Sequence, residues 1–198
     1  MLKKPFDYFL VGSFLVFLFF LILLASLDKD EAFFFIHKQR LGLLDAAMPY
    51  LTHLGDGLVF CLLFPILYST NKKAGIHLLI SGIFVLVLVQ VLKLLVFQDA
   101  LRPFGMLPNE RLYLLEGIDM HTSNSFPSGH TASAFVLFGV LAFYLKKPRH
   151  QLLLLLLASI AAWSRIYLGQ HFVGDVGAGL FIGLVGVWVG KIVVGKLK

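Results

Sequence analysis

Long apolar runs separated by short polar segments dominate the sequence. A membrane-spanning helix needs about 20 mainly apolar residues, and five runs approach this length, at residues 8–27, 74–97, 131–145, 152–168 and 176–194. A sixth run, residues 57–68, becomes long enough if its helix begins near Leu51 and continues to Ser69. The pattern predicts an all-α protein, a six-helix transmembrane bundle. Since no repeat or low-complexity tract interrupts it, we expect one membrane-embedded domain over residues 1–198.

The first apolar run shares one feature with a cleaved signal peptide, because Lys3 and Lys4 precede it. Its apolar stretch is longer than a signal peptide usually has, and the charged residues 28–30 that follow it make a poor cleavage site. We therefore expect a retained helix.

Charges alternate with aromatic and aliphatic side chains between the first two apolar runs, in residues 28–50. This pattern is typical of an amphipathic segment that lies in the membrane interface. An ordinary polar loop is the alternative for the first third of the segment.

Composition supports the membrane interpretation, because 59% of the residues are hydrophobic and only 14% are charged. A soluble domain of this length needs a more polar surface. Cys61 is the single cysteine, which excludes an internal disulfide and makes a cysteine metal site implausible. The net charge of +6 permits nucleic-acid binding, but the positive residues form short clusters between apolar runs, so we expect no nucleic-acid partner.

These basic clusters predict the orientation of the chain. With six spans, four clusters fall on one side, which the positive-inside rule makes cytoplasmic; they are Lys3 and Lys4, Lys72 and Lys73, Lys146, Lys147 and Arg149, and Lys196 and Lys198. The opposite side receives residues 28–55, residues 98–126 and the turn around Gln170, with nearly all the acidic residues.

Ionisable residues at the ends of membrane helices are functional candidates, because lipid does not solvate them. The first group on the outer side is Lys93 followed by Arg102-Pro103. A lone lysine at the position of Lys93 also suits snorkelling to the interface. The second group is Pro127-Ser128-Gly129-His130 at the start of a span. The exposed N–H groups of Ser128 and Gly129, together with the helix dipole, make an anion site there. A capped helix with an interfacial histidine is the alternative.

The third group runs from Ser164-Arg165 to His171 and Asp175. His171 and Asp175 are four residues apart, so on a helix they share a face and the carboxylate can hold one imidazole nitrogen. The other nitrogen is then free to attack. Arg165 adds a fixed fork of donors suited to phosphate. A structural ion pair between Arg165 and Asp175, with His171 incidental, is the alternative.

Taken together, the three groups predict a phosphate site at one membrane face. Two histidines, three cations and a helix N-terminus converge there, so that one imidazole can attack and the other can protonate the leaving oxygen.

These residues resemble the type 2 phosphatidic acid phosphatase (lipid phosphate phosphatase) superfamily, which shares its site with the vanadium haloperoxidases. The family pattern is a lysine followed by Arg-Pro, then Pro-Ser-Gly-His, then Ser-Arg, five residues, His, three residues and Asp. The second and third parts are complete here, within a motif-bearing core at about residues 74–194. The first part departs, since eight residues separate Lys93 from Arg102 where the family usually has six. We expect the extra residues to bulge into the loop at 97–101.

The resemblance implies a role for each matching residue. His171 would be the nucleophile that forms a phosphohistidine, Asp175 would orient it, and His130 would be the general acid. The phosphate-binding residues would be Lys93, Arg102, Ser128, Gly129 and Arg165. The family needs no metal and no other cofactor, and the sequence offers no clustered carboxylates at the site to hold Mg²⁺.

The leading hypothesis is an integral membrane lipid phosphatase in the bacterial cytoplasmic membrane, with its site facing the periplasm or exterior. By resemblance, its substrates would be undecaprenyl diphosphate, phosphatidylglycerophosphate, phosphatidic acid or lipid A phosphates. Alternatives are a lipid phosphotransferase, a haloperoxidase, which the apolar chain disfavours, and a non-enzymatic transporter or binding protein of lipid phosphates. The loop 104–125 is either a lid over the headgroup or a solvated connector. The sequence assigns no role to His53, His121 or residues 54–57, and it predicts no oligomeric state.

Overall fold

The computed structural model describes residues 7–196, and these residues form helices and loops without a strand. In chain order the elements are α1 (Asp7–Ser26), α2 (Lys29–His37), α3 (Gly42–Leu51), the 3₁₀ turn η1 (Thr52–Gly55), α4 (Gly57–Thr70), α5 (Lys72–Val91), the π turn η2 (Leu92–Val96), α6 (Pro103–Met106), the 3₁₀ turn η3 (Asn109–Arg111), α7 (Gly129–Tyr144), α8 (Pro148–Tyr167) and α9 (Val173–Lys196). The predicted all-α class is confirmed.

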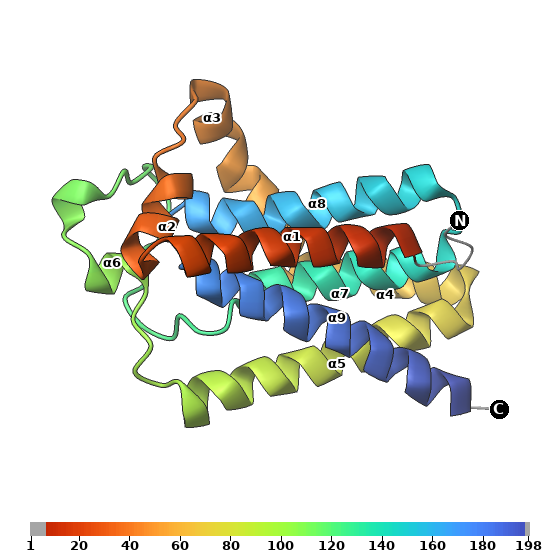
Figure 1. Cartoon of the computed structure of the whole chain (residues 1–198). Coiled ribbons are helices and arrows are strands. Elements are labelled where there is room, and N and C mark those ends of the chain that lie inside the picture. The colour runs from red at the N-terminus through yellow and green to blue at the C-terminus, as the bar shows by residue number, and fades with distance from the viewer. Residues whose placement is uncertain (1–6, 197–198) are drawn as a thin grey trace.

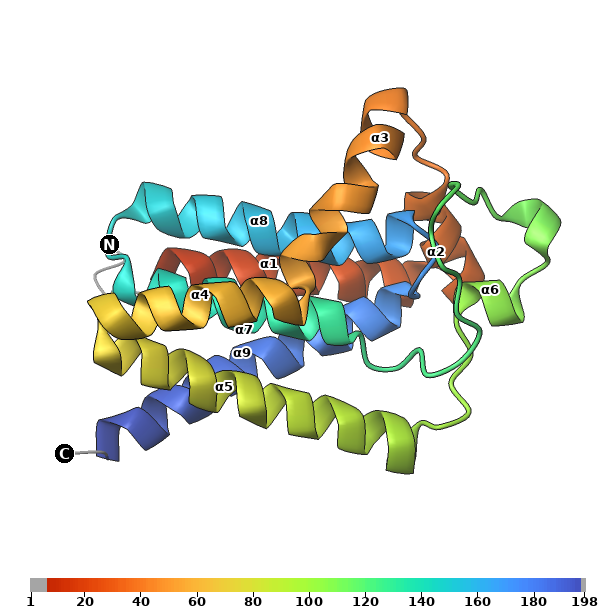
Figure 2. The ribbon, with the colours of Figure 1, turned by 180° about the vertical axis from the view of Figure 1, so that it is seen from behind.

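Six long helices, α1, α4, α5, α7, α8 and α9, run roughly along one direction, and α9 crosses α5 obliquely (Figure 1). The start of α1, the end of α9 and the α4–α5 and α7–α8 turns lie at one end of the bundle (Figures 1 and 2). The short helices α2, α3 and α6 and the long loop before α7 lie at the other end (Figures 1 and 2). The basic clusters of the two turns therefore share an end, as the sequence predicts.

Local sequence signals set several helix starts. The Ser128 side chain accepts a hydrogen bond from the Thr131 N–H at the start of α7, and the Asn71 side chain accepts one from the Ala74 N–H at the start of α5. Pro148 stands in the first turn of α8, where its missing N–H leaves no helical bond unmade.

The centre of the bundle is α7, which packs against α5, α8 and α9. Ten of its residues are buried, including Phe135, Val136 and Leu137, so α7 is a core helix on nearly every side. By contrast, α4 has no buried residue, and α5 leaves Ile83 and Leu86 exposed. Exposed apolar faces of this kind suit contact with lipid.

Within residues 7–196, four helical segments are long and apolar enough to cross a membrane: α1, α5 together with η2, α8 and α9. The segments Gly42–Gly55 and Gly57–Thr70 qualify together as a fifth span, although they meet at an angle of 54°. The apolar helix α7 is shorter, at 16 residues. The chain is thus a multi-pass membrane protein with four to five candidate spans by this criterion. The lysines at positions 3, 4 and 198, used to predict the orientation, lie outside the described residues.

The segment predicted to be amphipathic, residues 28–50, contains two helices with different environments. Five residues of α2, among them Phe33 and His37, are buried against the bundle. In contrast, α3 leaves Leu43 81% and Tyr50 77% exposed. Most of α2 is therefore part of the protein interior, with Phe35 exposed, whereas α3 presents the larger apolar surface to its surroundings.

Candidate active site

The predicted site residues gather at the end of the bundle that holds α2 and α6. They come from η2, the loop after it, the starts of α7 and α9, and the end of α8. The starts of α7 and α9 adjoin, because the Ser128 N–H donates to the Asp175 carbonyl oxygen at 3.0 Å. The charges of Arg102 and Arg165 act on Lys93, His130 and His171 alike. The structure thus brings the three sequence groups into one electrostatic neighbourhood.

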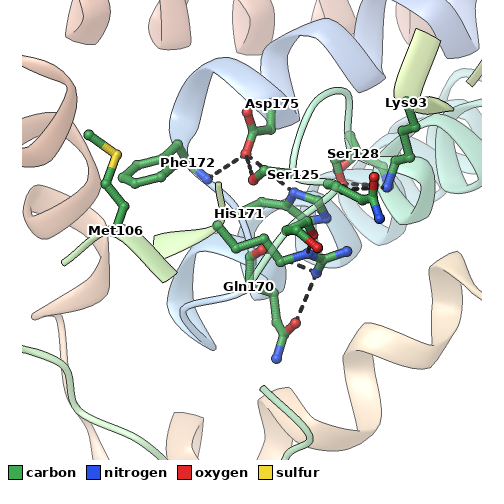
Figure 3. Close-up of polar contacts among 12 residues, drawn as sticks. Lys93, Met106, Ser125, Ser128, Gln170, His171, Phe172 and Asp175 are labelled. Carbon is green, nitrogen blue, oxygen red and sulfur yellow. Dashed lines mark hydrogen bonds and ion pairs between the residues drawn. The ribbon is translucent and has the colours of Figure 1, made fainter. Parts of the chain in front are cut away.

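His171 and Asp175 form the tightest polar cluster of the site (Figure 3). The Nδ1 atom of His171 lies 3.3 Å from Oδ2 of Asp175. The same oxygen accepts hydrogen bonds from the Ser125 hydroxyl at 2.5 Å and from the Phe172 N–H at 2.9 Å. Both side chains are buried. The carboxylate is therefore fixed by three donors, and it fixes the imidazole in turn.

The expectation that His171 and Asp175 share one helix is wrong, because α9 begins at Val173 and His171 lies in the turn before it. The reason is local: Asp175 is the third residue of α9, and its carboxylate accepts the N–H of Phe172. An acidic residue at this position favours a helix start directly after the residue that it caps. The carboxylate still reaches the imidazole across the helix start.

A glycine makes the turn that carries His171. Gly169 adopts a φ of +73°, which side chains rarely allow. The following N–H groups, of Gln170 and His171, both donate to the Arg165 carbonyl oxygen, at 2.9 and 3.2 Å. The chain therefore folds back over the end of α8 and holds His171 next to Arg165.

Burial favours the neutral form of the His171 imidazole, which is the form that can act as a nucleophile. Desolvation lowers the pKa of His171 to about 3, and Arg102 and Arg165 add to the lowering, while Asp175 opposes it. The imidazole is thus neutral at neutral pH. With Nδ1 engaged by Asp175, the lone pair of Nε2 is the one available for attack.

The guanidinium of Arg165 is buried, and its known partner is not Asp175. Its Nη1 donates to the Thr52 hydroxyl at 2.6 Å, while its Nε is buried without a hydrogen-bond partner among the described residues. No ion pair joins Arg165 to Asp175 in this part of the chain. The alternative of a structural ion pair between Arg165 and Asp175 is therefore not observed among the described residues. A buried donor of a charged group calls for an acceptor, and an oxygen of a phosphate ligand is chemically suited to that role.

Arg102 is held by backbone and side-chain oxygens from two loops. Its Nε donates to the Ser123 carbonyl at 2.9 Å, and its Nη1 donates to the backbone carbonyl and the side-chain oxygen of Gln170, at 3.3 and 3.1 Å. The loop 104–125 is thus anchored to the site at its end, because Ser123 positions Arg102 and Ser125 positions Asp175.

Lys93 lies in the π turn η2, where the Phe97 N–H bonds the Leu92 carbonyl five residues back, at 2.7 Å. A π turn inserts extra residues into a helix and is frequent at functional sites. Part of the extra length between Lys93 and Arg102 is therefore accommodated in η2, just before the bulge expected at residues 97–101. The Lys93 ammonium donates to the Asn124 carbonyl at 2.9 Å, so it points toward the site loop.

Ser128, Gly129 and His130 open α7. The Ser128 hydroxyl is buried and caps the helix, accepting from Thr131 through its N–H at 3.4 Å and its hydroxyl at 3.0 Å. A cleft of about 390 Å³ passes over this helix start, and its lining includes Lys93, Asn124, Gly129, His130 and Asp56.

Sequence reasoning missed three residues of this site. Ser125 bonds Asp175, Thr52 bonds Arg165, and Asp56 lies with its Oδ1 at 2.6 Å from Nε2 of His130. The one available signal was a charged residue between two glycines, Gly55-Asp56-Gly57, at the outer end of a predicted span. Among residues 7–196, no group of three or more histidine, cysteine or acidic side chains is arranged to hold a metal ion.

Comparison with known proteins identifies the family of this chain. The model of the PAP2 superfamily matches residues 74–198, which include all eight of the predicted site residues. The chain belongs to the PAP2 superfamily. The suspected family is therefore confirmed, and the match begins after the segment that carries Thr52 and Asp56.

Similar members of the superfamily are lipid phosphatases. The chain is 32% identical to an undecaprenyl-diphosphatase of Sulfolobus acidocaldarius over 80% of its own length and 73% of the relative. It is 33% identical to phosphatidylglycerophosphatase B of Bacillus subtilis, over 86% of this chain and 88% of the relative. The crystal structure of Aquifex aeolicus LpxE superimposes with a TM-score of 0.74 at 31% identity, covering 83% of this chain and 94% of that one.

Proposed function

We propose that this PAP2 protein hydrolyses a phosphomonoester or diphosphate of a membrane lipid through a phosphohistidine on His171. The observation that supports this most is a neutral, buried imidazole held by a carboxylate in a neighbourhood of three cations. Phosphoryl transfer spreads negative charge over three equatorial oxygens, so preorganised cations supply most of the stabilisation. In the proposal, Lys93, Arg102 and Arg165 bind these oxygens with the help of Ser128 and the Gly129 N–H.

A lipid substrate suits the surroundings of the cleft. An apolar groove of about 260 Å³ runs beside it and shares Gly57, Val85, Leu86 and Ser133 with its lining. The groove lies along α4 and α5, whose outer faces are exposed and apolar. A headgroup in the cleft can therefore keep its hydrocarbon chain in the groove and in the bilayer, with no apolar surface transferred into water.

The first chemical step transfers the phosphoryl group to the protein. Nε2 of His171 attacks phosphorus, the bond between phosphorus and the leaving oxygen breaks, and His130 protonates that oxygen. Asp175 stabilises the positive charge that develops on the His171 ring. In the second step His130 takes a proton from water, which attacks the phosphohistidine and releases inorganic phosphate and neutral His171.

The relatives indicate the substrate class. Their names state undecaprenyl diphosphate and phosphatidylglycerophosphate as substrates of the matching proteins. We extend the class to phosphatidic acid and lipid A phosphates, because the cations of the site address the phosphate and the lining of the groove is mainly apolar.

The proposed topology has six spans, with α3–α4 as the second and α7 as the fourth. In this arrangement the two basic turns face the cytoplasm and the site faces the periplasm or exterior of a bacterial cytoplasmic membrane. The exposed Leu43 near the start of α3 would then lie in the outer interface. As a core helix, α7 can be shorter than the others because protein and not lipid surrounds it.

Phosphate release in detergent tests the proposal. Wild-type protein should release phosphate from dioctanoyl phosphatidic acid or a short polyprenyl diphosphate, and orthovanadate, which mimics the pentacoordinate state, should inhibit it. His171→Ala should lower release at least roughly 10⁴-fold, since the chemistry has no other nucleophile. His150→Ala, a histidine at the opposite end of the bundle, is the matched control and should keep wild-type activity. Unchanged turnover by folded His171→Ala contradicts the mechanism.

A further inference from the structure

The turn between α3 and α4 carries a carboxylate that reaches the second imidazole of the site. Oδ1 of Asp56 lies 2.6 Å from Nε2 of His130, and its Oδ2 lies 2.6 Å from Nδ1 of His53. The His130 and Asp56 side chains are 36% and 29% exposed, and that of His53 is 65% exposed. Asp56 therefore joins an imidazole in the cleft to one at the surface.

The position of Asp56 in the chain makes these contacts informative. Asp56 is the N-cap residue of α4, where an aspartate normally accepts a hydrogen bond from the first turn of the helix. Its side chain makes no such bond. Both oxygens are directed at histidines instead, so the carboxylate is used for His130 and His53.

The backbone is built to let this turn approach α7. A Cβ atom on Gly55 would lie 2.6 Å from the His130 carbonyl oxygen, closer than real Cβ atoms come. Only glycine allows the chain to pass so near, and the contact brings Asp56 onto His130. The neighbouring Thr52 of the same turn bonds Arg165. The turn thus contacts two site residues at once.

From these contacts we propose that Asp56 is the positioning residue of His130, and that the site contains one aspartate for each of its two imidazoles. The carboxylate holds the Nε2–H of His130, which fixes the ring and leaves Nδ1 as the atom that exchanges protons with the substrate. His53 holds the second oxygen of Asp56. This inference rests on the proposed function, since it assigns a role within that reaction.

The proton balance follows directly. In the proposed cycle, Asp56 and the bound phosphate, both negative, favour the charged imidazole, so His130 enters the first step with protons on both nitrogens. When the phosphorus–oxygen bond breaks, the leaving oxygen takes the Nδ1 proton and His130 becomes neutral, still bonded to Asp56 through Nε2–H. In the second step Nδ1 takes a proton from the attacking water, and the starting state is restored.

The test compares two leaving groups in Asp56→Asn. An alkyl ester such as dioctanoyl phosphatidic acid needs a proton on its leaving oxygen, whereas p-nitrophenyl phosphate leaves as a stabilised phenolate. General acid catalysis contributes about 10²- to 10⁴-fold. Both esters form the same phosphohistidine, so kcat/KM, which reports only the steps up to departure of the leaving group, is compared. We therefore expect kcat/KM for the alkyl ester to fall roughly 100-fold and kcat/KM for the aryl ester to fall less than about 10-fold. Asp99→Asn, an exposed aspartate in the turn after η2, should change neither rate.

Equal losses on the two esters overturn the proposal, because a merely structural carboxylate affects both reactions alike. Asp56→Asn could lose activity on both esters and also unfold at a lower temperature. In that case Asp56→Ser, which keeps an oxygen at the N-cap, is measured, and its ratio of alkyl-ester to aryl-ester activity decides. His53→Asn should shift the ratio in the same direction by a few-fold. A wild-type protein that hydrolyses neither ester refutes the proposed function and this inference together, whereas an active wild type with an unchanged ratio refutes the inference alone.

Discussion

Single polar contacts set the geometry of the cations in this site. The hydroxyl of Thr52 is the one hydrogen-bond partner of the Arg165 guanidinium among the described residues, at 2.6 Å. A buried guanidinium has few ways to keep its direction without such a contact, and a phosphate binds best to a fork that already points at it.

Thr52→Val removes this contact at nearly constant volume. Hydrogen bonds to charged groups contribute about 1.5–3 kcal/mol, so we expect kcat/KM on a lipid phosphate to fall roughly 10- to 100-fold. Thr52→Ser keeps the hydroxyl and should stay within about threefold of wild type. Steady-state phosphate release measures both. If valine and serine behave alike, Thr52 does not position Arg165.

At the residue scale, the sequence predicts those site residues that obey a spacing rule. His171 and Asp175 stand four apart, and His130 follows a proline-serine-glycine start, so periodicity and capping preferences reveal them. Thr52 and Asp56 obey no such rule. They meet Arg165 and His130 through tertiary packing between parts of the chain more than 70 residues apart, and no local pattern encodes that packing.

At the element scale, α2 and the loop 104–125 are tied to α8 by one buried imidazole. Nδ1 of His37 lies 2.9 Å from the Tyr167 carbonyl, and its Nε2 accepts the Tyr113 N–H at 3.0 Å. Both contacts suit the neutral ring, with the proton on Nδ1. Burial and the neighbouring Arg40 lower the pKa of His37 to about 4.

This network predicts acid sensitivity below neutral pH. The unfolded chain binds a proton at His37 near pH 6.5 whereas the folded chain does so near 4, so stability falls as pH falls through this window. The limiting loss is roughly 3 kcal/mol, and His171, whose pKa is lowered to about 3, adds a loss of the same sign.

Thermal unfolding in detergent between pH 7 and 4 checks this expectation. The glutamine of His37→Gln can donate to one carbonyl and accept from one N–H without titrating. This variant should therefore flatten the pH dependence of the unfolding temperature. His121→Gln, in the exposed part of the loop, should leave the slope as it is in wild type. A steep slope that persists in His37→Gln would place the acid sensitivity elsewhere.

Element positions were the most predictable part of the fold. The apolar runs at 8–27 and 74–97 correspond to α1 and to α5 with η2, within two residues at each end. Departures occur where one specific hydrogen bond decides where a helix changes or begins. The π turn at η2 and the start of α9 after His171 are set by single hydrogen bonds, from the Phe97 N–H to the Leu92 carbonyl and from the Phe172 N–H to Asp175, and periodicity carries no information about them.

At the scale of the whole molecule, the two ends of the bundle differ in charge and chemistry. The turns with Lys72, Lys73, Lys146, Lys147 and Arg149 lie at one end, and the candidate site lies at the other. On the positive-inside rule, we propose that the bundle lies with its site outward.

Cysteine labelling tests this orientation. In a Cys61→Ser background, Glu116→Cys in the loop before α7 should react with a membrane-impermeant maleimide in intact spheroplasts. Lys147→Cys in the α7–α8 turn should react only after permeabilisation. The reverse result would put the site in the cytoplasm, while equal labelling of both positions in intact spheroplasts would contradict the bundle's spanning arrangement.

The hydrogen bond from Arg165 to Thr52 also bears on how members of this superfamily can be recombined. The shared family region begins at residue 74. Arg165 lies inside this region, yet it donates to the hydroxyl of Thr52, which stands more than 20 positions before the region begins. A chimera that joins residues 74–198 to the leading helices of a distant homologue would inherit the arginine without its support. The exchangeable unit therefore starts upstream of α4, and a crossover point placed before Thr52 is the one that should preserve turnover.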